Sequence, residues 1–293
     1  MYSFLKQSIF PAVDDLGTHL IKLVNSGLYF AITFIILHYI GHAWSTANAW
    51  HYGYSPLFSY NGMDSLLGTT GWTARRTGII HLMPPFVGFL GLVIGLISFH
   101  SISIRKTQAR AFSFWLAFNG LLVYISYLVT GVLSGLSFSS EYFTGFVGFY
   151  AWLYWKDATI YGMLVLQFIL CLPVIFILSR MCLKLGYSKV SMKNAEGKIA
   201  AWINGIILPV VLGIIIVLAA TFPMDFSFQA ARIVTIVPIT GLLLFGLLLQ
   251  SSNNINPLKG GIKPLPKTFI ILAVAAIIFF SRAVLSLRIE PLW

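Results

Sequence analysis

Seven apolar stretches divide this chain, each about 20 residues long and separated by short polar connections. A helix of that length crosses the roughly 30 Å of hydrocarbon in a bilayer. The stretches predict seven transmembrane helices, at about 21–43, 78–100, 111–136, 158–180, 199–221, 231–250 and 268–287. No connection is long enough for a separate soluble domain, so residues 1–293 form a single integral membrane domain. The predicted fold is all-α, a polytopic membrane helix bundle.

Composition supports this assignment and removes other protein classes. Only 9% of the residues are charged while 58% are hydrophobic, whereas soluble domains carry about 25% charged residues. Intrinsically disordered chains have few hydrophobic residues and many charged ones. The net charge of +11 is typical of membrane-flanking loops rather than of a nucleic-acid site, so we expect no nucleic-acid partner. The expected location is the cell membrane.

Lysine and arginine alternate between connections in a way that predicts orientation. The positive-inside rule places the richer set in the cytoplasm. That set comprises Lys6, Lys22, Arg105, Lys106, Arg110, Arg180, Lys184, Lys189, Lys193, Lys198, Lys259, Lys263 and Lys267. The poorer set comprises Arg75, Arg76, Lys156, Arg232, Arg282 and Arg288. The amino terminus is therefore predicted inside and the carboxyl terminus outside.

Ionisable side chains near the outer ends of the helices are the candidates for chemistry. His38 and His42 are four residues apart on the first helix and share one face. His81 begins the second helix and Asp157 stands at the outer entry of the fourth. Two helical histidines at this spacing form half of a zinc site, which His81 or Asp157 would complete. The alternative interpretation is that the imidazoles bond to neighbouring helices or to headgroups.

The first helix also carries a family resemblance. The run FIILHYIGHAWSTANAWHYGY resembles the zinc-binding helix of site-2-type intramembrane metalloproteases, in which His-Glu-x-x-His leads into small and aromatic residues. The resemblance implies that His38 and His42 are metal ligands and that zinc is the cofactor. The catalytic glutamate, however, is replaced by Tyr39, and tyrosine is too weak a base near neutral pH to activate metal-bound water. The resemblance therefore implies an inactive member.

That family's third ligand is an aspartate in a Pro-Leu-Asp-Gly-Gly-like motif. This chain has Pro257-Leu258-Lys259-Gly260-Gly261, with lysine in place of the aspartate. The predicted topology puts this loop on the inner face, across the membrane from His38. We therefore interpret the match as a coincidence and favour Asp157 as the acid.

Two further hypotheses use the same residues differently. Haem b needs one imidazole from each of two facing helices at one depth, and His42 with His81 would meet that need in an electron-transfer or quinone-handling subunit. Alternatively the protein performs no chemistry and is a scaffold or subunit of a larger membrane complex. Whether the protein is an enzyme stays open between these hypotheses.

Small and polar residues predict how the helices pack. Gly91 and Gly95 form a GxxxG pair with Gly88 on nearly the same face, and Asn119 and Ser126 lie on a polar stripe of the third helix. Such residues bring membrane helices close and link them by hydrogen bonds. The aromatic residues of the two long outer connections are typical of the headgroup layer, although a partner subunit would also bury them. The expected partners are thus the lipid bilayer and other membrane subunits.

Overall fold

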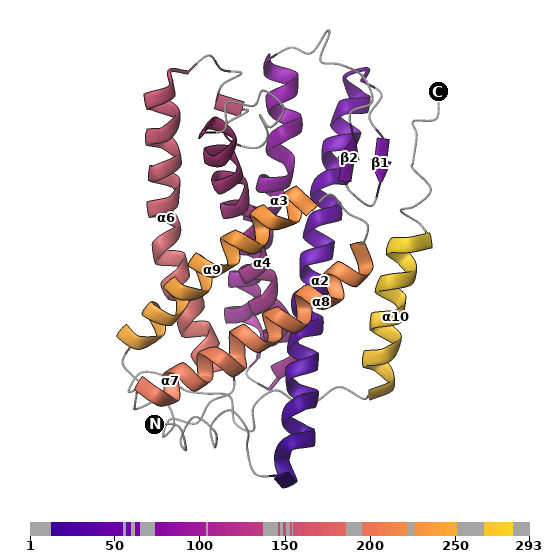
Figure 1. The fold of residues 1–293 in the computed structure, drawn as a ribbon, viewed down its shortest axis with the longest axis vertical. Coiled ribbons are helices and arrows are strands. Elements are labelled where there is room, and N and C mark those ends of the chain that lie inside the picture. Colours follow the sequence, from indigo (N-terminus) through magenta and orange to yellow (C-terminus); the bar gives the residue numbers. More distant parts are fainter. Residues whose placement is uncertain are drawn as a thin grey trace.

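The computed structural model is an all-helical bundle with one small hairpin (Figure 1). It describes residues 13–54, 57–59, 62–64, 74–103, 105–136, 146, 149–150, 153, 155–185, 195–221, 226–250 and 267–283. The helices are α2 (Val13–His51), α3 (Ala74–Ser101), α4 (Thr107–Leu136), α6 (Asp157–Lys184), α7 (Ala195–Trp202), α8 (Leu208–Thr221), α9 (Phe226–Leu249) and α10 (Lys267–Ala283). The π-helical segment η2 (Ile203–Ile207) joins α7 to α8.

Every predicted membrane span coincides with a helical segment, counting α7, η2 and α8 as one. Among the described residues, five helical segments are long and apolar enough to cross a membrane, and a shorter apolar helix covers Val234–Leu249. The chain is therefore an integral membrane protein with several spans. The total of seven spans and the orientation of the ends stay predictions.

The first helix is longer than its apolar run. Residues from Trp44 onward were expected in a connection, but α2 continues to His51. A short antiparallel hairpin follows, in which β1 (Leu57–Ser59) pairs with β2 (Gly62–Asp64). Trp44 and Trp50 therefore lie on a helix rather than in a loop.

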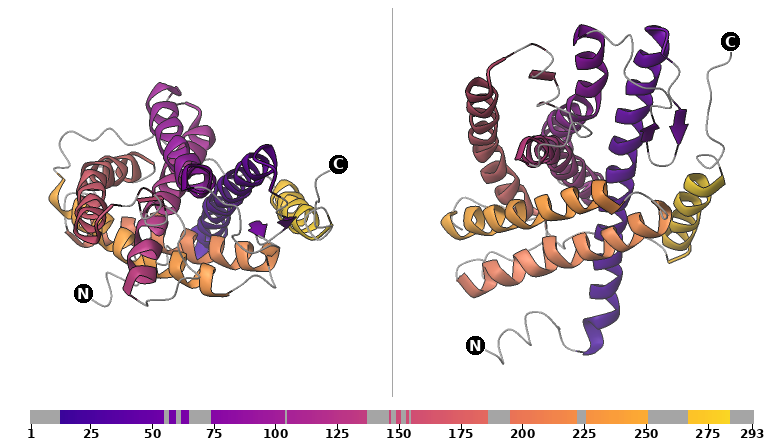
Figure 2. Two further views of the ribbon diagram at one scale, coloured as in Figure 1. Left: turned by 90° about the horizontal axis from the view of Figure 1, so that it is seen from above. Right: turned by 45° about the horizontal axis from the view of Figure 1, so that its top comes forward.

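The helices differ in their direction through the bundle. Figure 1 shows α2 and α6 running along the long axis, while α8 and α9 cross them obliquely, and Figure 2 gives the same arrangement from two other sides. α2 packs against α3, α4 and α8, whereas α6 packs against α9 and α4. α2 and α6 are therefore on opposite sides of α4.

Glycine allows α3 and α4 to touch through their backbones. A Cβ atom at Gly95 would meet the backbone of Ala117, and one at Gly120 would meet the backbones of Leu92 and Gly88. Lipid chains are as apolar as leucine, so close van der Waals contact is what holds such helices together. The predicted close packing of Gly88 and Gly95 is confirmed.

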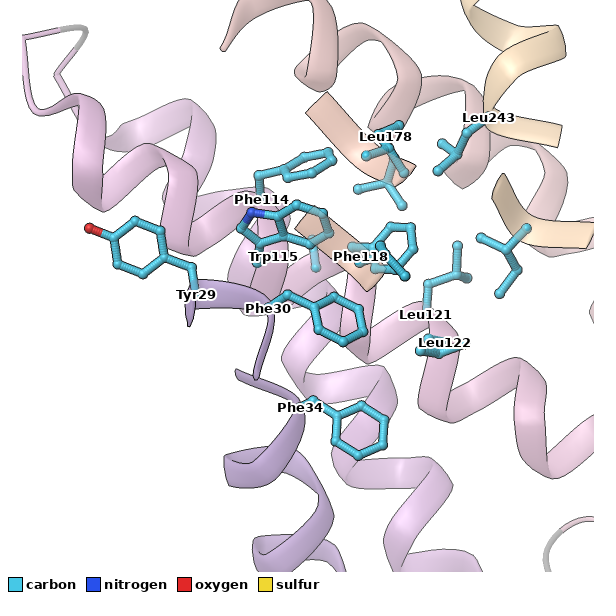
Figure 3. Close-up of a cluster of buried hydrophobic side chains, with 14 of the residues drawn as sticks. Tyr29, Phe30, Phe34, Phe114, Trp115, Phe118, Leu121, Leu122, Leu178 and Leu243 are labelled. Carbon is cyan, nitrogen blue, oxygen red and sulfur yellow. The ribbon is translucent and has the colours of Figure 1, made fainter. Parts of the chain in front are cut away.

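Aromatic rings join α4 to α2 in the hydrophobic core (Figure 3), and α4 side chains also donate three hydrogen bonds to α2. The Phe30 and Trp115 rings meet edge to face, with centroids 5.5 Å apart. Trp115 Nε1 donates to Ser26 Oγ over 2.9 Å. Asn119 Nδ2 donates to the Phe30 carbonyl over 2.8 Å and to Thr33 Oγ1 over 2.7 Å. The interhelical role expected of Asn119 is thus seen, and Ser126 Oγ donates to the Val123 carbonyl of its own helix.

The π-helical turn precedes a proline. Pro209 has no N–H to give to the Gly205 carbonyl, and its ring would crowd the preceding turn of a regular helix. The wider turn of η2 lies at this point. Trp202 Nε1 on one side of it donates to the Thr240 carbonyl of α9, while Gly213 on the other side packs against Gly27 of α2.

The aromatic residues of the second long connection have mixed surroundings. Phe146 and Tyr150 are buried with residues of α4 and α6. The Tyr150 ring stacks on Trp155 at 4.9 Å, and Gln167 Nε2 donates to the Tyr150 hydroxyl. Phe146 and Tyr150 therefore fill the space between two helices, and their depth in the membrane stays a prediction. Phe149 packs beside Tyr150, while Tyr142, Phe143, Trp152 and Tyr154 lie outside the described residues.

The glycine contact gives a direct prediction. Gly95→Ala and Gly120→Ala should each lower the free energy of unfolding by about 1–3 kcal/mol, because the added methyl forces two backbones apart. Gly162→Ala on exposed α6 is the matched control, since no atom lies within 4 Å of its Cβ position. It should unfold at or slightly above the wild-type temperature, as alanine is the better helix former. Thermal unfolding in detergent measures all three, and equal stability among them would contradict the packing.

Candidate functional site

The histidine pair of α2 is formed as the sequence predicted. The rings of His38 and His42 lie 4.6 Å apart between centroids, with an angle of 70° between their planes. The i, i+4 spacing on a regular helix is the cause. His38 is almost fully buried and His42 partly so. Two imidazoles are therefore held together inside the protein.

Aromatic side chains surround His38. The Phe34 ring stacks on it at 6.4 Å, one turn before, and the Tyr39 ring lies 5.0 Å away. Tyr39 is only 8% exposed and belongs to the main hydrophobic cluster. Tyr39 is thus used for packing.

Close contact with α3 fixes this part of α2. A Cβ atom at Gly41 would lie 2.9 Å from the Pro84 Cα. Pro84 has no N–H, so it cannot satisfy the Ile80 carbonyl one turn before it. Ser45 Oγ of α2 donates to that carbonyl over 2.9 Å, which is the way membrane bundles compensate for proline. The sequence offered a signal for this bond, since Ser45 follows Gly41 by one turn.

The predicted additional ligands are placed differently. His81 follows Ile80 on α3 and is partly buried. Among the residues described in the structure, no group of three or more histidine, cysteine, aspartate or glutamate side chains could hold a metal ion. His81 therefore does not join His38 and His42 in a three-ligand site. The helices α2 and α3 are in contact, while a shared polar site of the first, second and fourth spans stays a prediction.

Asp157 begins α6, as predicted for the entry of the fourth span, but its side chain lies outside the described part of the chain. α6 packs on α4 and α9, and in Figures 1 and 2 it stands at the opposite edge of the bundle from α10, with α2 beyond α4. The position of the Asp157 side chain relative to the histidine pair therefore stays a prediction.

The haem hypothesis meets a steric obstacle. Ligation by His42 and His81 requires a porphyrin between α2 and α3. These helices touch at Gly41 and Pro84 and share the Ser45 hydrogen bond to Ile80. No space for a macrocycle is left at this contact, so the geometry does not favour haem.

No protein-family model, curated protein or solved structure matches the chain.

The burial of Tyr39 predicts an asymmetric response to substitution. Tyr39→Glu should lower the free energy of unfolding by at least about 2 kcal/mol, because a carboxyl group would enter a hydrophobic cluster. Tyr39→Phe keeps the ring beside His38 and should lower the free energy of unfolding much less. Unfolding of both variants in mixed detergent micelles compares them. A Glu variant as stable as the Phe variant would show that this position is open to water.

Proposed function

We propose that this protein is a non-proteolytic integral membrane protein of the cell membrane, a divergent relative of site-2-type intramembrane metalloproteases that acts by binding through its helices. The observation that carries the proposal is Tyr39. It occupies the position of the catalytic glutamate, is 8% exposed, and lies 5.0 Å from the His38 ring. A buried phenol cannot take a proton from water near neutral pH.

A complete zinc centre is not supported by the residues present. A catalytic site needs three protein ligands and an open fourth position. His38 and His42 supply two ligands, and no three-residue ligand group is found among the described residues.

The outer surface of the bundle supports a binding role. α6 exposes most of its apolar side chains, which include Val165, Leu166, Ile169 and Leu170. α10 does the same with Leu272 and Phe279. Exposed apolar faces of this kind are buried by lipid or by a neighbouring helix. Partner subunits of a larger membrane complex would bind along these faces.

A second candidate function is zinc binding without catalysis. The separation of 4.6 Å between the His38 and His42 rings fits two imidazoles on one tetrahedral ion. Bound zinc would stabilise α2 and offer a Lewis acid to further ligands. Water or a partner would supply the rest of its coordination.

The absence of proteolysis is testable directly. The purified chain, reconstituted in nanodiscs with zinc and a tagged single-span substrate, should release no more product than the His38→Ala/His42→Ala variant. The physical reason is the missing base and third ligand. Gel analysis of the tagged fragments measures release. Cleavage that depends on both histidines and disappears with a chelator would overturn the proposal.

Zinc binding has its own test. Protein incubated with zinc and desalted should retain about one ion per chain, and His38→Ala and His42→Ala should each lose it. His100→Ala is the control, since His100 is exposed on another helix and its Nδ1 bonds the Leu96 carbonyl. Elemental analysis by mass spectrometry gives the ratio. A metal-free wild type would remove the zinc candidate and leave the binding role standing.

A further inference from the structure

Three basic side chains gather at the end of the bundle where α3 ends, α4 begins and α6 ends. Arg180 and Lys184 are one turn apart on α6 and share one side of that helix. Arg110 lies in the first turn of α4, which packs against α6, and Lys184 is within electrostatic range of both arginines. Three positive charges on two helices are therefore close together.

Arg110 is held in a defined orientation. Its Nε donates to the Phe99 carbonyl in the last turn of α3 over 3.0 Å, and its guanidinium carbon lies 4.7 Å from the centre of the Phe99 ring. The residue is only 7% exposed. A guanidinium has five N–H donors, and only the Nε–H is used by an acceptor among the residues the structure describes. The remaining donors are available to a ligand.

No carboxylate balances these charges within the described part of the chain. Glu196 of α7 is the one acidic side chain in the described part of the chain, and it forms no ion pair with Arg110, Arg180 or Lys184 there. Arg110 also lies in the first turn of α4, where the helix dipole adds positive potential. Like charges near low-dielectric surroundings repel strongly, so an anion at this point would be stabilised.

The depth of the cluster indicates the kind of anion. The apolar spans Gly78–Ser101, Thr107–Val129 and Ala158–Lys184 end or begin at this level, which corresponds to the lipid headgroups. Phosphate oxygens match the planar fork of arginine and accept from lysine as well. Basic pockets between membrane helices bind lipid phosphates in this way.

We propose that Arg110, Arg180 and Lys184 form a binding site for a phosphate group, as carried by the headgroup of an acidic phospholipid. Arg110 supplies the oriented guanidinium between α3 and α4, and the two α6 side chains close over the phosphate. A phosphate held there links α6 to the α3–α4 pair. Soluble phosphate has the same chemistry, and the experiment separates the two sources.

The test compares two double variants that remove equal charge from the same end of the protein. Arg180→Gln/Lys184→Gln removes two members of the cluster and leaves Arg110 in place to bond α3. Arg105→Gln/Lys106→Gln removes two exposed cations from the neighbouring connection. Native mass spectrometry of the full chain in detergent, titrated with phosphatidic acid or with phosphatidylcholine, measures lipid binding. Thermal unfolding with inorganic phosphate tests the soluble source.

We expect phosphatidic acid to bind in preference to phosphatidylcholine. The Arg180→Gln/Lys184→Gln variant should bind it about tenfold more weakly, and the Arg105→Gln/Lys106→Gln variant should change by less than about twofold. If the two variants differ in this way with inorganic phosphate but not with phosphatidic acid, the site is supported and its ligand is soluble phosphate. Equal losses in both variants, or no preference over phosphatidylcholine, would overturn the proposal, because the attraction would then be that of a diffuse basic surface.

Discussion

Backbone carbonyls that a helix cannot satisfy are the constraint around which this bundle is organised. In hydrocarbon such a group has no water to bond, so another part of the protein must supply the donor. Ser45 bonds the Ile80 carbonyl that Pro84 leaves open, and Arg110 bonds Phe99 at the end of α3. Lys198 donates to Leu248 and Gln250 at the end of α9. Each bond fixes the position of one helix along the axis of its neighbour. Backbone contact through Gly95 and Gly120 also fixes the distance between α3 and α4.

This constraint shapes the region that most resembles a catalytic centre. Contact between Gly41 and Pro84 brings α3 against α2 beside the histidine pair, and the rings of Phe34 and Tyr39 pack around His38. A hydrolytic site needs an open position for water and substrate. Here Tyr39 extends the hydrophobic cluster instead. Tyr39 therefore supplies packing surface beside His38 and offers no carboxylate there.

Sequence patterns predicted the helices well because length and apolarity are local properties. They placed the end of α2 too early, because polar residues such as Ser45 and Asn48 lower hydropathy without interrupting the helix. The histidine pair was predictable from its spacing alone. The position of Asp157 relative to it was not, since periodicity gives the face of a helix and never the order of helices in a bundle. For the same reason Arg110, Arg180 and Lys184 indicated only orientation until the fold brought two helices together.

The π-helical turn at Ile203–Ile207 sets the directions in which the side chains of α8 point. One additional residue in a turn advances the helix azimuth by about 100°. The half before the turn directs Trp202 toward α9, and the half after it directs Gly213 toward Gly27 of α2. The continuous segment of α7, η2 and α8 can thus turn one face toward α9 before the π-helical turn and a different face toward α2 after it. Loss of that one residue would rotate α8 out of register with α2, so this segment should tolerate substitution far better than deletion.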